Sequence, residues 1–397
     1  MDNHKPHPQF VRGIQAGLRY WQVETQDESD AAIRRLDAER HNLYRLVQYG
    51  RAVPDLWPDT AVLARNAFYL VERRGYWSEW IPVLEQAVTQ WVQDDLRLKG
   101  QLLNQLGYFY CANRQLTAAV TAHAQAGQIA RELANTDLLN HAWFYLCADY
   151  RHLRQYDQAE QYGILALAGF EQADNNKWQA CAHNELGLLA YHRGDLVRAR
   201  QRLETAVALH RQSGGVTDLL RTLNNLIGVA RAEKNYDLAL AYYREAASYF
   251  DVSSSEFDRT VFETALGGTL FELGRYAEAE AAFRRANTPY LQHSQHIHQR
   301  ALVWQCLGNV LLKQNHLDES ESCLQESARL WAAASDDMLL ANTLGTLGEL
   351  YMAKREAQTA VAYFDQALFH LDKFPDDATA VRLKGEFSVL KALLYQP

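Results

Sequence analysis

Several features are scarce in this sequence, and each scarcity excludes a class of protein. No apolar run is long enough to span a membrane, and the start, MDNHKPHPQF, lacks the apolar core of a signal peptide. We therefore expect a cytoplasmic protein without a membrane partner. Basic side chains number 40 against 48 acidic ones, the net charge is -8, and no Lys/Arg-rich run occurs, so nucleic acid is not expected as a partner.

Turn-forming residues and cysteines are also few. The 397 residues include 21 Gly and 8 Pro, whereas 48% of the chain is hydrophobic, which favours an all-α protein. This length exceeds one compact core, so we expect several domains or an elongated repeat array. The cysteines are odd in number, widely spaced and mostly within apolar helical pattern, which predicts reduced core thiols: Cys111, Cys147, Cys181, Cys306 and Cys323.

Motifs of known catalytic chemistry are missing as well. The chain has no G-x-x-x-x-G-K-[ST] phosphate loop, no H-E-x-x-H helix, no G-x-S-x-G turn and no dinucleotide-binding glycine motif. We therefore predict a protein that is not an enzyme and holds no cofactor or metal. The single histidine cluster, His293, His296 and His298, has a spacing that could serve metal binding. It falls where one repeat ends and the next begins, which favours a polar corner instead.

A Leu-Gly pair recurs along the chain at intervals of 40 residues, and once of 41. The pairs are Leu106-Gly107, Leu186-Gly187, Leu266-Gly267, Leu307-Gly308 and Leu347-Gly348, with Leu146-Cys147 and Leu226-Ile227 as variants. Ten residues after each Leu we expect a second helix to begin, at Leu116, Tyr156, Leu196, Tyr236, Tyr276, Leu317 and Ala357. Small residues follow three and ten positions later. This spacing predicts closely packed antiparallel helix pairs.

The breaks between the helices suggest how each pair turns. We expect the first helix to end in a left-handed residue, at Gly75, Gly194 and Gly274, or at Asn235 and Asn315. Asp195 or Asp237 then suits the start of the second helix. One hairpin cannot bury both of its faces, so neighbouring hairpins must stack into an α-solenoid.

The predicted domain organisation follows from the extent of the repeat. With an earlier, weaker unit around residues 67 to 87, eight repeats occupy residues 59–372. Residues 1–58 form a helical lead-in, and residues 373–397 form one capping helix with Asp376 or Asp377 near its start. The most polar break, DVSSSEFD at residues 251 to 258, is predicted to be the most flexible point.

The pattern Leu-Gly, then Gly-Asp-Leu-x-x-Ala, then Ala seven residues later resembles the tetratricopeptide repeat. The usual unit has about 34 residues, so each helix here should be roughly a turn longer. Units of this length resemble those in the sensor arms of bacterial signal-transduction ATPases and in peptide-binding regulators. Residues 34 to 50, through Leu36, Glu39, Asn42 and Leu43, resemble the helix that leads into such arms. The resemblance implies a right-handed superhelix and an ATPase or effector domain as partner, in cis or in trans.

In tetratricopeptide arrays the first helix of each pair lines a concave groove, and fixed positions around the Leu point inward. Carried onto this sequence, these positions and the residues beside them give the candidate ligand-binding residues Asn104, Tyr108, Phe144, Arg151, Asn184, Leu188, Tyr191, His192, Asn224, Arg231 and Gln305. The carboxamides match the alternating donors and acceptors of an extended peptide, although bonds between neighbouring repeats would also explain them. The arginines, with His152 and His192 beside them, suit a carboxylate or an acidic peptide.

Two functions are therefore open at this point. The first is a non-enzymatic scaffold or sensor whose groove, within residues 104 to 232, binds a protein or peptide segment. The second is a structural protein that assembles with copies of itself through its terminal helices and groove.

Overall fold

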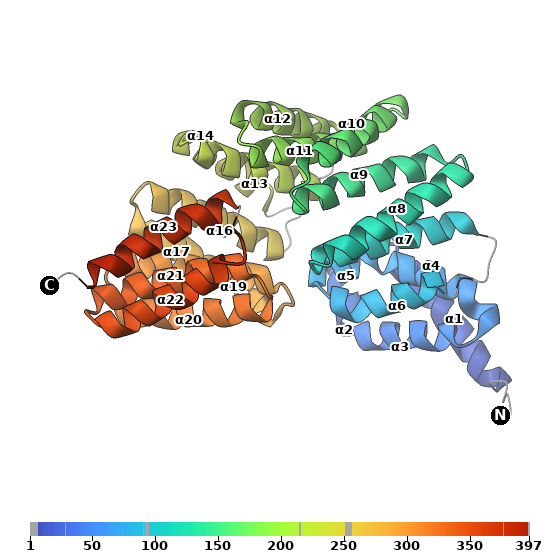
Figure 1. Ribbon diagram of the computed structural model, residues 1–397. Helices are drawn as coiled ribbons and strands as arrows, with labels where there is room; N and C mark the ends of the chain where they lie inside the picture. The colour runs from blue at the N-terminus through green and yellow to red at the C-terminus, as the bar shows by residue number, and fades with distance from the viewer. Residues whose placement is uncertain are drawn as a thin grey trace. The chain divides into compact units, whose positions relative to one another are not determined.

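The computed structural model describes residues 7–27, 29–89, 91, 95–213, 216–250, 256–375 and 377–395, and every regular element within these ranges is a helix. The predicted all-α array of consecutive helix pairs is confirmed (Figure 1). The chain forms two compact units, residues 1–229 and 230–397.

The first unit begins with shorter helices and continues with regular pairs. It contains α1 (Pro8–Glu24), α2 (Asp30–Ala38), α3 (Arg40–Arg51), the 3-10 turn η1 (Pro54–Leu56), α4 (Trp57–Asn66), α5 (Phe68–Arg74), α6 (Trp77–Thr89), α7 (Leu96–Ala112), α8 (Leu116–Glu132), α9 (Thr136–His152), α10 (Tyr156–Gln172), α11 (Asn176–His192) and α12 (Leu196–Ser213). Helix α13 (Val216–Ala232) contains the boundary between the units.

The second unit continues the same alternation. It contains α14 (Tyr236–Ala247), α16 (Glu256–Glu272), α17 (Tyr276–Ala286), α18 (Pro289–His293), α19 (Ile297–Lys313), α20 (Leu317–Ala333), α21 (Asp337–Ala353), α22 (Ala357–Leu371) and α23 (Ala378–Leu393). Most of the break predicted to be flexible, residues 251–255, lies outside the described residues.

The turn inside each pair was predicted accurately at one end and less well at the other. All seven second helices from α8 to α22 in the regular repeats begin at the predicted residue. The left-handed position that ends the first helix is taken by Gly75, Gly194, Gly274 and Asn315, as expected, but also by residues without special turn propensity, such as Arg114 and Arg154. The prediction for Asn235 was wrong. Lys234 is left-handed there, and Asn235 instead caps α14 by accepting a hydrogen bond from the backbone N–H of Leu238.

The glycine of each Leu-Gly pair makes room for a large side chain of the second helix. A Cβ built on Gly107 would lie 2.4 Å from Nε2 of His123, which is fully buried. The same relation links Gly187 with Leu203, Gly267 with Phe283, Gly308 with Leu324 and Gly348 with Phe364. Where the pair is Leu146-Cys147, the small residue has moved to the second helix, because Gly163 lies against the Cys147 sulfur. In these pairs the small residue can therefore lie on either helix, and the larger side chain of the other helix fills the space.

The last helix, α23, packs against α21 and α22 of the second unit. Asp377 accepts hydrogen bonds from the backbone N–H groups of Thr379 and Ala380 at the start of α23, whereas Asp376 lies outside the described residues. The Phe387 ring lies directly over Gly345 of α21. Within the described ranges, no helix has the length and hydrophobicity that a membrane span requires.

Candidate functional site

Polar side chains join successive first helices of the first unit. They stand at one repeated position, which is the residue immediately before the recurring Leu. Gln105 on α7 donates its Nε2 hydrogen to the carbonyl oxygen of Ala64 at 3.2 Å. On α13, Asn225 likewise donates from Nδ2 to the Oδ1 of Asn184 on α11 at 2.8 Å. Each bond reaches the preceding repeat, so this position holds neighbouring hairpins in register.

Half-buried aromatic rings extend across the first helices from α5 to α11. The ring centroids of Phe68 and Tyr108 are 5.2 Å apart, those of Tyr108 and Tyr145 6.1 Å, and those of Tyr145 and Phe144 5.2 Å. Phe144 in turn meets Trp178 at 5.3 Å. All these contacts have the edge-to-face geometry that aromatic pairs prefer. We call these five residues the aromatic row.

An ion pair joins the two ends of this surface. Glu72 on α5 accepts a hydrogen bond from Arg221 on α13, and the same carboxylate oxygen accepts one from the Tyr108 hydroxyl at 3.1 Å. The residues of the ion pair are 149 positions apart in sequence. The contact therefore brings side chains of α5, α7 and α13 together, and we call the aromatic row with Glu72 and Arg221 the interior surface of the first unit.

The protonation of this cluster follows from its contacts. Burial opposes the ionised form of Glu72, but the charge and hydrogen bond of Arg221 outweigh it and hold the pKa of the carboxyl below its ordinary value. The Glu72 charge raises the pKa of Arg221, and burial followed by Glu72 raises the pKa of Tyr108. At neutral pH this interior thus holds a carboxylate, a guanidinium and neutral phenols.

A second ion pair lies on α9 and α11. The Arg151 guanidinium contacts the Glu185 carboxylate at 3.0 Å, and the two side chains are only 9% and 14% exposed. Burial, followed by the charge of Arg151, lowers the pKa of His152 to about 3. Burial and then Arg151 also lower the pKa of His192. The expected basic character of these repeats is therefore offset by Glu185 and by two neutral imidazoles.

The predicted site residues occupy several kinds of environment. Asn184 bonds to a neighbouring helix, and buried Gln305 in the second unit accepts a hydrogen bond from the Trp331 indole at 3.3 Å. Asn104 is buried, and its Oδ1 accepts no hydrogen bond from the described residues. Leu188 is half-buried, and Tyr191 and Asn224 are half-buried and make no side-chain hydrogen bond to described residues. His192 is exposed, and Arg231 belongs to the second unit.

Comparison with known proteins agrees with this architecture. The family model described as "Tetratricopeptide repeat" matches residues 264–288, which span the turn between α16 and α17. The fold is that of a tetratricopeptide-repeat solenoid.

Solved structures of other proteins share this fold, and a further protein is similar over part of its sequence. The apo form of the quorum sensor NprR from B. thuringiensis has a TM-score of 0.57 at 13% identity, and the match covers 91% of this chain and 99% of NprR. A signal transduction ATPase with a tetratricopeptide repeat sensor, from Pyrococcus horikoshii, has a TM-score of 0.58 at 13% identity and covers 90% of this chain and 55% of its own. Regulatory protein RapG of Bacillus subtilis is 21% identical over 136 residues, which make up 34% of this chain and 37% of RapG.

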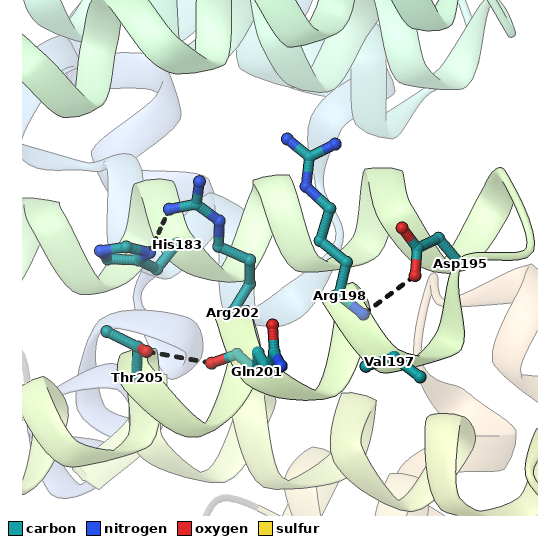
Figure 2. A pocket seen from close by; sticks show the side chains of 7 residues that line it. All are labelled: His183, Asp195, Val197, Arg198, Gln201, Arg202 and Thr205. Carbon is teal, nitrogen blue, oxygen red and sulfur yellow. Dashed lines mark hydrogen bonds between the residues drawn. The ribbon is translucent and has the colours of Figure 1, made fainter.

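A hollow lined by none of the residues of the aromatic row lies on α11 and α12. It has a volume of about 580 Å³ and is lined by His183, Asp195, Val197, Arg198, Gln201, Arg202 and Thr205. Figure 2 shows the long side chains of Arg198 and Arg202 extending from the same side of α12. Arg202 donates to Nδ1 of His183 at 3.2 Å, and burial followed by Arg202 lowers the pKa of this histidine to about 4. Because the hollow is open and its arginines already have partners, we do not assign the main site to it.

The histidine cluster does not assemble into a site. His293 ends α18 and bonds to the carbonyl oxygen of Pro289, His296 is the N-cap residue of α19 and packs on Phe257, and His298 lies in the first turn of α19. The described residues contain no group of three or more His, Cys, Asp or Glu side chains that could hold a metal ion.

Sequence reasoning missed four residues of this surface: Glu72, Tyr145, Glu185 and Arg221. Tyr145 and Glu185 precede a conserved Leu, and this position recurs with Gln105 and Asn225 in the other repeats of the unit. The same position was therefore a readable signal. Glu72 and Arg221 had no such signal, because their pairing depends on how far the solenoid curves.

Proposed function

We propose that this protein is a non-enzymatic scaffold or sensor, and that the first helices of residues 1–229 bind an extended segment of a protein or peptide partner. One observation carries the proposal: the half-buried aromatic row runs along the first helices, and on the same set of helices Tyr191 and Asn224 are half-buried and make no side-chain hydrogen bond to described residues. Half-buried aromatic residues are the usual anchors of protein recognition, and a free carboxamide can both donate to and accept from a peptide backbone.

The named functions of the similar proteins support the same class. One is a quorum sensor, one carries a tetratricopeptide repeat sensor within a signal transduction ATPase, and one is a regulatory protein. We propose by analogy that this chain supplies the sensing part of a signalling system, with an effector such as an ATPase domain in cis or in trans.

The proposal can be tested with random dodecapeptides displayed on phage and selected on the full chain. Fluorescence anisotropy then measures the dissociation constant of a recovered peptide. The Tyr191→Ala and Asn224→Ala variants should each weaken binding by about tenfold, since an anchor or a directed hydrogen bond contributes about 1–2 kcal/mol. Tyr20→Ala, at a 57% exposed tyrosine on α1, is the matched control and should bind like the wild type.

Two outcomes would contradict the proposal. Selection on the wild-type chain could recover no binders, or both variants could bind as tightly as the wild type while circular dichroism shows the same helix content. Measuring the solution mass over a concentration series distinguishes peptide binding from self-assembly. The mass of a sensor without its ligand should not increase with protein concentration, whereas that of a self-assembling protein should.

A further inference from the structure

Arg151 and Arg231 hold the same place in two repeats but differ in their electrostatic partners. Each lies five residues after the conserved Leu of its first helix. Arg151 is neutralised by Glu185, which lies 34 residues further along the chain. The residue 34 positions after Arg231 is Ala265 on α16, which has no group to pair with a guanidinium.

The structure shows the consequence of this difference. Arg231 makes no hydrogen bond and no ion pair with any described residue, and its Nε atom is buried without a partner. Its guanidinium lies flat against the next first helix at Gly268, where a Cβ would stand 2.9 Å from Cζ, Nη1 and Nη2. An unpaired charge that is partly withdrawn from water costs free energy. An anion that pairs with the guanidinium would offset this cost, which favours its binding.

The following first helix, α19, carries groups that are compatible with a peptide ligand. Burial raises the pKa of the Cys306 thiol on α19 to about 11 against an opposing effect of the Arg231 charge, so this thiol is neutral. On α19, Asn309 occupies the position equivalent to Gly268, and its Oδ1 is buried without a hydrogen-bond donor. An unsatisfied acceptor of this kind suits a peptide N–H.

We propose that Arg231, resting on Gly268, is a carboxylate-binding site of the second unit and selects peptide segments that carry an acidic group. The inference rests on the proposed function only in taking a peptide as the ligand. The carboxylate belongs either to an Asp or Glu side chain or to the C-terminus of the peptide. A planar guanidinium with two free Nη groups matches either one by paired hydrogen bonds.

The test selects two libraries of random dodecapeptides on the full chain, one fused at the peptide C-terminus and one with that C-terminus free. On the wild type, enrichment of Asp and Glu in the first library indicates side-chain recognition, whereas binders found only in the second indicate recognition of the terminal carboxylate. A recovered peptide should lose about tenfold in affinity when its carboxylate is changed to the amide, as expected for a charge-assisted hydrogen bond.

Three variants connect this preference with Arg231. Arg231→Gln removes the charge, and Ala265→Glu gives Arg231 a carboxylate partner like the one that Glu185 gives Arg151. Both variants should therefore abolish the difference in affinity between the acid and the amide forms of the peptide. Ala265→Gln adds the same bulk without the charge and should keep it. Gly268→Ala should also abolish the preference, because the new Cβ displaces the guanidinium, whereas Gly385→Ala on α23, which meets nothing within 4 Å, should have no effect.

The results separate the two proposals. If wild-type binders show no acidic preference in either library, or if Arg231→Gln and Ala265→Glu keep the preference while circular dichroism shows an intact fold, the carboxylate site is refuted and peptide binding stands. If the wild type recovers no peptides at all, the proposed function and this inference both fail.

Discussion

The ion pair between Glu72 and Arg221 predicts a local effect on stability. Glu72→Gln keeps the shape of the side chain and its contact with Tyr108 but removes the charge. The Glu72 side chain is 10% exposed and that of Arg221 49%. Exposed pairs contribute about 0–1 kcal/mol, and breaking a fully buried pair costs about 3–5 kcal/mol. This half-exposed pair falls between these limits, so we expect a loss of about 1–2 kcal/mol.

The assay must report on the two helices that the pair joins, because a chain with two compact units does not have a single unfolding transition. Native-state hydrogen exchange meets this need. In the Glu72→Gln variant the amides of α5 and α13 should exchange about 5–30 times faster, which corresponds to the expected 1–2 kcal/mol. Glu386→Gln, which breaks the exposed pair with Arg382 on α23, is the control and should change exchange little.

The pH dependence has a definite sign. The pKa of Glu72 is lowered in the folded chain, so its contribution is complete above the ordinary carboxyl pKa of 4.5 and is lost as the pH falls below that value. Wild type and variant should therefore differ at pH 7 and converge in acid. Equal exchange rates at pH 7, or a zero coupling energy when Glu72→Gln is combined with Arg221→Gln, would refute the reasoning.

Two further stability predictions follow from the packing and from the hollow. Gly107→Ala should lower the free energy of unfolding by about 1–3 kcal/mol, because its Cβ would overlap His123, whereas Gly228→Ala, with nothing within 4 Å, should be neutral or stabilising in thermal denaturation. The pKa of His183 is lowered to about 4 by burial and Arg202, so its contribution to stability should be lost between pH 6.5 and 4. His183→Gln should flatten that part of the stability profile, and an unchanged profile would rule this contribution out.

The helix boundaries were predictable because each depends on local spacing, while the identity of the turn residues was not. Leu116 and Tyr156 begin their helices as expected, since ten residues always separate them from the preceding Leu. Arg114 and Lys234 nevertheless adopt the left-handed conformation that glycine would take more easily. Packing of the two helices fixes the direction of the chain at that point, and its free energy exceeds the roughly 1 kcal/mol cost of a left-handed side chain.

Spacing from the recurring Leu indicates which positions are candidates for the surface, but not which other side chains they contact. Inward positions counted from the recurring Leu include Tyr108, whose ring lies in the aromatic row. They could not show that Tyr108 would bond to Glu72, since that contact requires the curvature produced by several stacked repeats. Small changes in packing angle add up along a solenoid, so contacts between distant repeats escape an argument from local spacing.

In a repeat array, a charged residue that lacks an ion-pair partner can be recognised by comparing it with the equivalent residue of another repeat. The spacing of 34 residues that joins Arg151 to Glu185 on neighbouring first helices reaches Ala265 when it is applied to Arg231. In a protein without repeats there is no equivalent residue with which an unpaired arginine can be compared, so its lack of a partner is hard to interpret. Here an equivalent, paired arginine supplies that reference, and the difference reduces to one carboxylate. That missing group defines the chemistry a ligand would need to supply.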